Sequence, residues 1–209
     1  MSFGISLTVI FGFLTGAVNV WLLARRNIWN WPIGLANNAL YVAVFLTAGL
    51  YGDAGLQLVY IALGIYGWWT WACPSGGADL QVARTPRQTW TWLIPATAIA
   101  AIGLRFFLLN FTDSTVPSWD GLTTALALAA IYGQCRKYLE SWWIWIAADL
   151  IYIPLYIYKN LWLTSGLYFV FLLLCVVGLR EWSKALGAQS YSDARNAKRL
   201  CWDDSGSAR

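Results

Sequence analysis

Histidine is absent from this sequence of 209 residues, and charged residues are scarce at 11%. A soluble domain carries roughly 25% charged residues, so this chain has too little polar surface to cover a globule in water. The four cysteines show no CxxC spacing and have no histidine to join them. The sequence therefore predicts neither a structural zinc site nor a disulfide framework, and no cofactor is expected.

Apolar and aromatic residues are abundant instead, at 59% and 17% of the chain. Seven apolar segments, each close to the ~20 residues that cross a bilayer as a helix, stand between polar turns. They lack the alternation of barrel strands. The first segment has no basic region before it and no small-residue cleavage site, so we expect it to be retained. The prediction is an all-α integral membrane protein with seven transmembrane helices, at residues 3–24, 30–50, 54–73, 90–109, 119–135, 142–159 and 161–181.

The basic residues are distributed unevenly between the predicted loops. Twelve of the fourteen Lys and Arg residues follow the first, third and fifth helices or lie in the tail, while Arg105 and Lys159 lie elsewhere. Since cytoplasmic loops are enriched in Lys and Arg, the N-terminus is expected outside and the C-terminus in the cytoplasm. The tail, residues 183–209, is rich in Ser, Asp and Arg and is expected to be disordered.

The chain matches itself at an offset of 111 residues without a gap. Paired positions include Arg25 with Arg136, Trp31 with Trp142, Tyr41 with Tyr152, Gly67 with Gly178 and Trp71 with Trp182. Four helices separate equivalent points, so both copies have the same orientation in the membrane. We therefore expect a 3+1+3 parallel repeat, with residues 1–73 and 119–182 as the repeats and 74–118 as the linker region with the fourth helix. Such duplication favours a transporter with its solute site between the halves.

Polar side chains within the predicted helices mark a candidate site, because each costs free energy in hydrocarbon unless it finds a partner. Residues 142, 145, 149, 152 and 156 are two Trp, one Asp and two Tyr. They follow one another at intervals of three or four residues, which places them on one helix face. Rings with a carboxylate and amides suit a flat, positively charged heteroaromatic that carries hydroxyls. The candidate substrate-binding residues are Asn37, Asn38, Tyr41, Gln57, Tyr60, Trp142, Trp145, Asp149, Tyr152, Tyr156 and Tyr168.

Each of these residues also has a simpler interpretation. Asn and Gln can be interhelical hydrogen-bond partners, worth about 0.6 kcal/mol each. Trp142 and Trp145 begin a helix and can belong to the interfacial aromatic belt. Asp149 can accept a proton, contact tyrosine hydroxyls or meet a cationic solute. The residues alone leave these alternatives open.

A set of features spread over most of the chain resembles the PnuC family of bacterial vitamin transporters. They are, in order, Asn37, Tyr51, Gln57, Tyr66-Gly67-Trp68, Trp119-Asp120, Arg136-Lys137-Tyr138, the W-x-x-W pair Trp142 and Trp145, Gly178 and Trp182. The resemblance implies a helix arrangement like that of SWEET sugar transporters, a homotrimer, and the bacterial inner membrane. It also implies facilitated diffusion of nicotinamide riboside, with phosphorylation by a separate cytoplasmic kinase trapping the solute.

The resemblance leaves the vitamin open, because family members also carry thiamine and riboflavin. By matching position, Trp142, Trp145, Asn37 and Gln57 are implied as substrate contacts, and Asp149 stands where some members have Asn. Two other classes fit less well. A retinal receptor needs a lysine inside its last helix, where this sequence has none, and an intramembrane enzyme lacks histidine or a second carboxylate near Asp149. The expected partners are therefore the vitamin, the bilayer, further copies of the chain in a homotrimer and, as a functional link, the kinase; nucleic acid is not expected.

Overall fold

The computed structural model describes residues 7–47, 49, 51–74, 79–112, 116–158 and 160–206, and these form seven α-helices without a β-sheet. The seven predicted helices are confirmed, with ends that differ by a few residues except at the last, which continues well past residue 181. Two of them, Arg87–Phe111 and Trp162–Ser192, are long and apolar enough on their own to cross a membrane. The helices are α1 Leu7–Ala24, α2 Asn30–Thr47, α3 Tyr51–Ala72, α4 Arg87–Phe111, α5 Pro117–Cys135, α6 Ser141–Tyr158 and α7 Trp162–Gly206.

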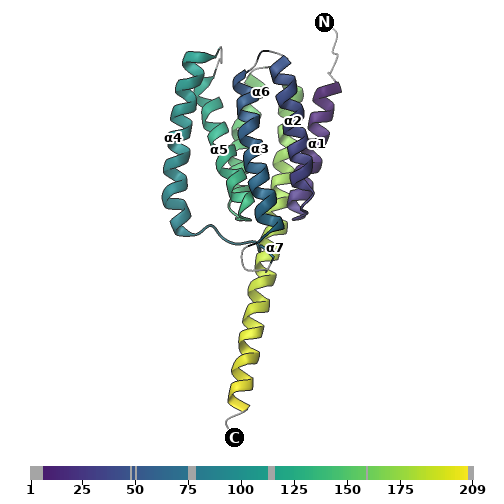
Figure 1. Ribbon diagram of the computed structural model, residues 1–209, viewed down its shortest axis with the longest axis vertical. Coiled ribbons are helices and arrows are strands. Elements are labelled where there is room, and N and C mark those ends of the chain that lie inside the picture. Colours follow the sequence, from purple (N-terminus) through teal and green to yellow (C-terminus); the bar gives the residue numbers. More distant parts are fainter. Residues whose placement is uncertain are drawn as a thin grey trace.

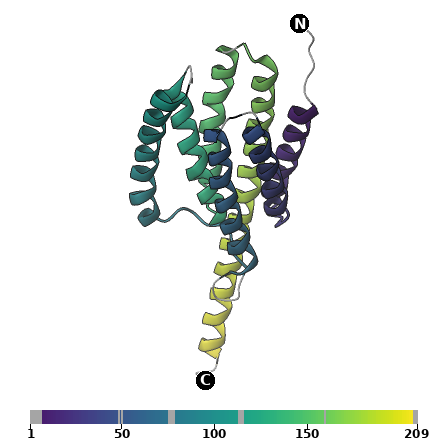
Figure 2. The same cartoon turned by 45° about the horizontal axis from the view of Figure 1, so that its top comes forward.

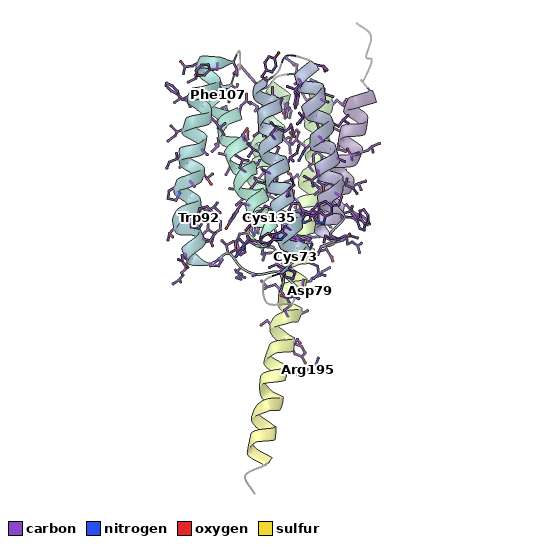
Figure 3. The ribbon with its side chains drawn as sticks, viewed as in Figure 1. Cys73, Asp79, Trp92, Phe107, Cys135 and Arg195 are labelled. Carbon is purple, nitrogen blue, oxygen red and sulfur yellow. The ribbon has the colours of Figure 1, made fainter. Side chains whose placement is uncertain are left out.

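Six of the helices form a closed ring. Neighbours around it are α1, α2, α3, α5, α6 and α7, and α7 packs back on α1. Among the described helices α4 packs against α5 alone and lies at the edge of the bundle (Figure 1). Trp92 and Phe107 lie near opposite ends of α4 (Figure 3), and Trp92 packs edge-to-face on Tyr132 of α5 with ring centroids 5.1 Å apart. The ring can therefore enclose a space that α4 does not reach.

The helix α7 continues well beyond the bundle as a single extension (Figures 1 and 2). We call the end of the bundle from which it leaves the tail end; Cys73 and Cys135, near the ends of α3 and α5, lie there in Figure 3. The helix α1 begins at the opposite end (Figure 2).

The extension differs from the predicted disordered tail, since residues 183–206 are helical, while 207–209 lie outside the described residues. No proline follows Pro154, and the packed part of α7 already supplies the helix nucleus, so Ala, Leu, Gln, Lys and Arg extend it at little cost. The polar composition marks exposure to water and not loss of structure.

The segment between α3 and α4 is fixed to the turn between α5 and α6. The backbone N–H of Ala83 donates to the Lys137 carbonyl at 3.1 Å, and the N–H of Leu139 donates to the Ala83 carbonyl at 2.9 Å. The Thr85 N–H and hydroxyl both donate to Glu140 Oε2, at 2.7 and 2.8 Å. These bonds hold the connection across the tail end of the bundle, where Figure 1 shows it.

Backbone geometry recurs at the offset of 111 found in the sequence. Arg26 and Lys137 have φ angles of 57° and 52°, and Gly49 and Asn160 have 74° and 57°. Positive φ is uncommon for residues other than glycine, so two such coincidences at one offset are informative. The turn between the first and second helix and the turn between the second and third helix therefore each have a left-handed residue at the equivalent place in both halves.

Candidate functional site

A cavity of about 350 Å³ lies inside the ring, with residues from all six of its helices in the wall. Its wall combines ring faces, amides and one carboxyl group, with small residues between them. The polar and aromatic residues of the wall are Asn19, Asn30, Trp31, Asn38, Tyr60, Gln134, Trp142, Trp145, Asp149, Tyr152, Tyr168, Phe171 and Cys175.

Four tryptophans close the tail end of the cavity. Trp31 packs edge-to-face on Trp71, with ring centroids 5.5 Å apart at 86°, and Trp142 packs on Trp182 at 5.4 Å and 89°. Trp71 and Trp182 meet at 6.3 Å and join the two pairs. Because the pairs are related by the offset of 111, the same aromatic arrangement is built once from each half of the chain.

Two glycines make room for this packing. A Cβ on Gly67 would overlap the Trp31 ring, and a Cβ on Gly178 would overlap the Trp142 ring, both well inside van der Waals contact. Trp142 has no exposed surface, so it is a packed part of the wall and not a free stacking surface.

Reciprocal hydrogen bonds tie the halves together at the same end. Trp71 Nε1 donates to the Gln134 carbonyl at 3.2 Å, and Trp182 Nε1 donates to the Leu23 carbonyl at 3.2 Å. Gln134 and Leu23 are themselves 111 residues apart, so each half contributes one donor and one acceptor in equivalent positions. The two bonds join α3 to α5 and α7 to α1, the two places at which the halves meet.

Lys137 lies against the tryptophan cluster from outside the ring of helices. Its Nζ is 4.2 Å from the Trp71 ring centroid and donates to the Leu80 carbonyl at 2.8 Å. Burial lowers the pKa of Lys137, repulsion from Arg26 lowers it further, and Asp79 opposes both. The ammonium group therefore holds Trp71 through a cation–π contact.

Tyrosine and phenylalanine rings pack around the part of the cavity farther from the tail end. Tyr168 contacts Tyr152 with ring centroids 4.6 Å apart and Tyr156 at 5.0 Å. Tyr168 also contacts Phe171 at 6.0 Å, and Phe171 packs edge-to-face on Phe13 of α1 at 5.5 Å. The cavity thus lies between a tryptophan cluster and a cluster that is mostly tyrosine.

Asp149 is the acidic group of the cavity, only 2% exposed. Its Oδ2 accepts a hydrogen bond from Cys175 Sγ at 3.6 Å, a weak donor. The positions equivalent to these two residues in the first half are Asn38 and Gly64, and both also line the cavity. The acid–thiol pair therefore belongs to one side of the cavity only.

Several polar atoms of the wall are buried without a hydrogen-bond partner in the described part of the chain. They are the Nε1 atoms of Trp31, Trp142 and Trp145 and the Oδ1 atom of Asn19. Buried polar groups are almost always paired, so a cluster of unpaired donors and an acceptor around one cavity needs a reason. Each of these atoms is itself buried, so a solute in the cavity can pair with them only after the wall moves.

Residues 6–184 match the sequence profile of a family described as nicotinamide mononucleotide transporter. That match covers most of the chain. The chain belongs to this family.

Curated relatives are transporters of two vitamins. The chain is 28% identical over 175 residues to the riboflavin/roseoflavin transporter RibM of Streptomyces davaonensis, with 82% of each chain covered. It is 23% identical over 197 residues to the nicotinamide riboside transporter PnuC of Escherichia coli, again covering 82% of each. The crystal structure of the vitamin B3 transporter PnuC has the same fold, with a TM-score of 0.65 at 23% identity over 85% of this chain and 80% of that one. The resemblance seen in the sequence is confirmed, and the family is one of transporters and not of enzymes.

Seven of the eleven predicted substrate-binding residues line the cavity. They come from α2, α3, α6 and α7, and solute binding by each remains a prediction. They are Asn38, Tyr60, Trp142, Trp145, Asp149, Tyr152 and Tyr168.

Asn37 and Tyr41 lie against α1 instead of in the cavity wall. Asn37 Nδ2 donates to Thr15 Oγ1 at 3.0 Å and lies 3.5 Å from the Gly12 carbonyl, and the Tyr41 hydroxyl packs on Gly12. Tyr41 also stacks on Phe45, as its equivalent stacks on Tyr156 in the second half. Asn37 therefore has the geometry of an interhelical hydrogen-bond partner.

Gln57 and Tyr156 are also outside the cavity wall. Tyr156 supports Tyr168 by stacking, and Gln57 Oε1 is buried without a hydrogen-bond partner among the described residues. Both lie nearer the end of the bundle at which α1 begins, since α3 starts and α6 finishes there.

Six polar or aromatic wall residues were not predicted from the sequence, namely Asn19, Asn30, Trp31, Gln134, Phe171 and Cys175. Two signals were available. Asn19 is the one amide inside the first apolar segment, and Trp31 is the repeat partner of Trp142, which was predicted. Asn30 and Gln134 lie at helix ends, where an amide usually faces water and gives no signal.

Proposed function

We propose that this protein imports a flat, ring-bearing vitamin, with nicotinamide riboside as the first candidate. The observation that supports this most is the cavity inside the helix ring, which is lined by aromatic side chains, amides and one carboxyl group. Ligand sites are typically apolar and aromatic with a few placed polar groups, and about 350 Å³ is at the small end of their range.

The charges of the wall suit this solute. Among the described residues that line the cavity none is Lys or Arg, and Asp149 is acidic. The pyridinium ring of nicotinamide riboside carries a positive charge, which a carboxylate and ring faces both favour. Trp145 is half-buried in the wall and offers the solute a stacking surface.

Riboflavin is the second candidate because of the relative RibM, and thiamine, a further cation, stands behind it. Riboflavin has three fused rings and no charge, so it needs more space than a single pyridine ring and gains nothing from Asp149. The small volume and the carboxyl group place nicotinamide riboside first.

For the transport cycle we infer a 3+1+3 parallel repeat of the SWEET type, with α1–α3 and α5–α7 as the halves and α4 as the linker helix. Support comes from the geometry repeated at an offset of 111. Alternate opening of the tryptophan end and the tyrosine end would move solute by facilitated diffusion. Trapping by a cytoplasmic kinase, a homotrimer, and an inner-membrane orientation with the C-terminus in the cytoplasm complete the proposal.

The test is uptake by proteoliposomes without an ion gradient. Radiolabelled nicotinamide riboside, thiamine and riboflavin are offered separately, with empty liposomes as the control. We expect the internal concentration of nicotinamide riboside to rise to the external one and no further. Accumulation above that level contradicts facilitated diffusion, and no uptake of any of the three contradicts vitamin transport.

A further inference from the structure

The two halves of the chain meet at two seams, one between α3 and α5 and the other between α7 and α1. At the tail end each seam has one indole bond, donated by Trp71 at the first and by Trp182 at the second. The offset of 111 residues makes the seams equivalent, so every other bond at one seam can be compared with the same positions at the other.

The seam between α3 and α5 has an arginine–tyrosine bond that the other seam cannot form. Arg136 Nη1 donates to the Tyr66 hydroxyl at 3.5 Å. The equivalent residues are Arg25 and Val177, and valine has no polar atom to accept the bond. Arg25 lies instead over the Trp21 ring of α1, 5.5 Å from the ring centroid.

Lys137 and Cys135 add two contacts at the same seam. Lys137 Nζ lies 4.2 Å from the Trp71 ring centroid, whereas its equivalent, Arg26, is exposed and has no cation–π contact with a described ring. Cys135 Sγ donates weakly to a carbonyl of α3 at 3.4 Å, where the equivalent Ala24 has no donor. Neither contact has a counterpart between α7 and α1.

The segment between α3 and α4 reinforces the seam between α3 and α5 from outside. It is bonded to the α5–α6 turn through Ala83 and Thr85. Lys137 links it to α3, since the ammonium group that lies on the Trp71 ring also donates to the Leu80 carbonyl. The described chain has no such segment at the other seam, because α7 leaves the bundle as a helix (Figure 1).

The tail end of the seam between α7 and α1 is held mostly by apolar packing. Leu23 and Ala24 belong to the same buried cluster as Trp182. Glu181 pairs with Lys184 of its own helix at 3.1 Å, and the two arginines that follow α1 attract it without a direct ion pair. Apolar contacts have no direction, whereas each hydrogen bond must break before its partners part. Separating α1 from α7 therefore breaks fewer bonds than separating α3 from α5.

We propose that the cavity opens towards the tail end by separation of α1 from α7, so that the solute passes between these two helices. The seam between α3 and α5 stays closed and acts as the hinge. The proposal rests on vitamin transport through this cavity and adds to it the place at which one end opens.

The experiment bridges each seam at equivalent positions and measures uptake. Arg25→Cys with Val177→Cys bridges α1 to α7, and Arg136→Cys with Tyr66→Cys is the matched control that bridges α3 to α5. Because the repeat relates the two pairs, a bis-methanethiosulfonate reagent of one length serves both. None of these four residues lines the cavity.

Both pairs are made in the full-length protein with serine in place of Cys73 and Cys201, while Cys135 and Cys175 stay because they are buried. Uptake of radiolabelled nicotinamide riboside by proteoliposomes is measured before bridging, after bridging and after reduction of the bridge. Mass spectrometry of the joined peptides from the single-chain band confirms that the bridge lies within one chain.

Bridging α1 to α7 should slow uptake at least about tenfold, and reduction should restore it, because alternating access needs this end to open. Bridging α3 to α5 should leave the rate within about twofold of the unbridged protein, since a hinge does not part. Uptake that survives the first bridge, or is lost with the second, overturns the proposal. If the wild type carries none of nicotinamide riboside, thiamine and riboflavin, the proposed function itself fails.

A second variant tests the seam without a bridge. Val177→Tyr places a hydroxyl opposite Arg25 and so copies the pair found at the other seam, and Val177→Phe is the control that lacks the hydroxyl. The tyrosine variant should transport about three- to tenfold more slowly than the phenylalanine variant, because opening now breaks one more hydrogen bond. Equal rates in the two variants contradict opening at this seam.

Discussion

Replacing Gly178 by alanine tests the packing at the tail end of the cavity. The new Cβ would overlap the Trp142 ring, which has no exposed surface and is held by Trp182, so the ring cannot move aside without disturbing the cluster. Overpacking a core costs 1–3 kcal/mol, and the overlap here places Gly178→Ala near the upper value. Alanine regains about 1 kcal/mol through its helix propensity. The net expected loss of stability is about 2 kcal/mol.

A control in the same helix separates the packing from the propensity. Gly166 has open space around its Cβ position, so Gly166→Ala should be neutral or slightly stabilising. The assay is the temperature at which half of the detergent-solubilised protein remains monodisperse after heating. Gly178→Ala is expected to melt below the wild type and Gly166→Ala at or above it.

A double variant decides whether the clash is with Trp142. Combining Gly178→Ala with Trp142→Phe, which shortens the ring system, should destabilise less than the sum of the two single changes, because neighbours in contact are not additive. Additive effects, or a Gly178→Ala protein as stable as Gly166→Ala, would refute the reasoning.

Three further predictions concern the cavity. Asp149→Asn should weaken binding of cationic nicotinamide riboside at least about tenfold, while uncharged riboflavin changes little, as measured by calorimetry. Trp145→Ala should weaken binding by about 1–3 kcal/mol if the solute ring stacks on it, and Trp143→Ala, on the exposed side of α6, should not. Trp71→Phe and Trp182→Phe should each lower the stability by about 0.5–1.5 kcal/mol, because each loses one bond between the halves.

Each of these predictions has a result that contradicts it. Equal loss of both vitamins in the Asp149 variant would make the carboxyl group structural. Matching losses in the Trp143 and Trp145 variants would indicate a general effect on the fold. An unchanged melting temperature in both Trp→Phe variants would mean that the indole bonds do not hold the halves together.

Two adjacent asparagines show that the sequence does not determine which side chain of a helix faces the cavity. Asn37 and Asn38 have the same chemistry, but successive residues of a helix point about 100° apart, so the two amides meet different surroundings. The structure turns Asn38 inward and Asn37 towards α1. Trp142 was predicted as a stacking surface and lines the cavity, yet it is packed on both sides, which its position in the sequence did not reveal.

The sequence alone determined the seven helices, the repeat offset and the family, and it identified the helix face that bears Asp149. Hydrocarbon leaves backbone groups no partner outside the helix, so apolar length and polar turns suffice to place each helix. Only the tertiary structure decided which polar residues share a cavity, because that depends on how each helix is rotated against its neighbours. Asn19 and Trp31 come together with Asp149 for that reason alone: no spacing along the chain connects them, and the closure of the ring does.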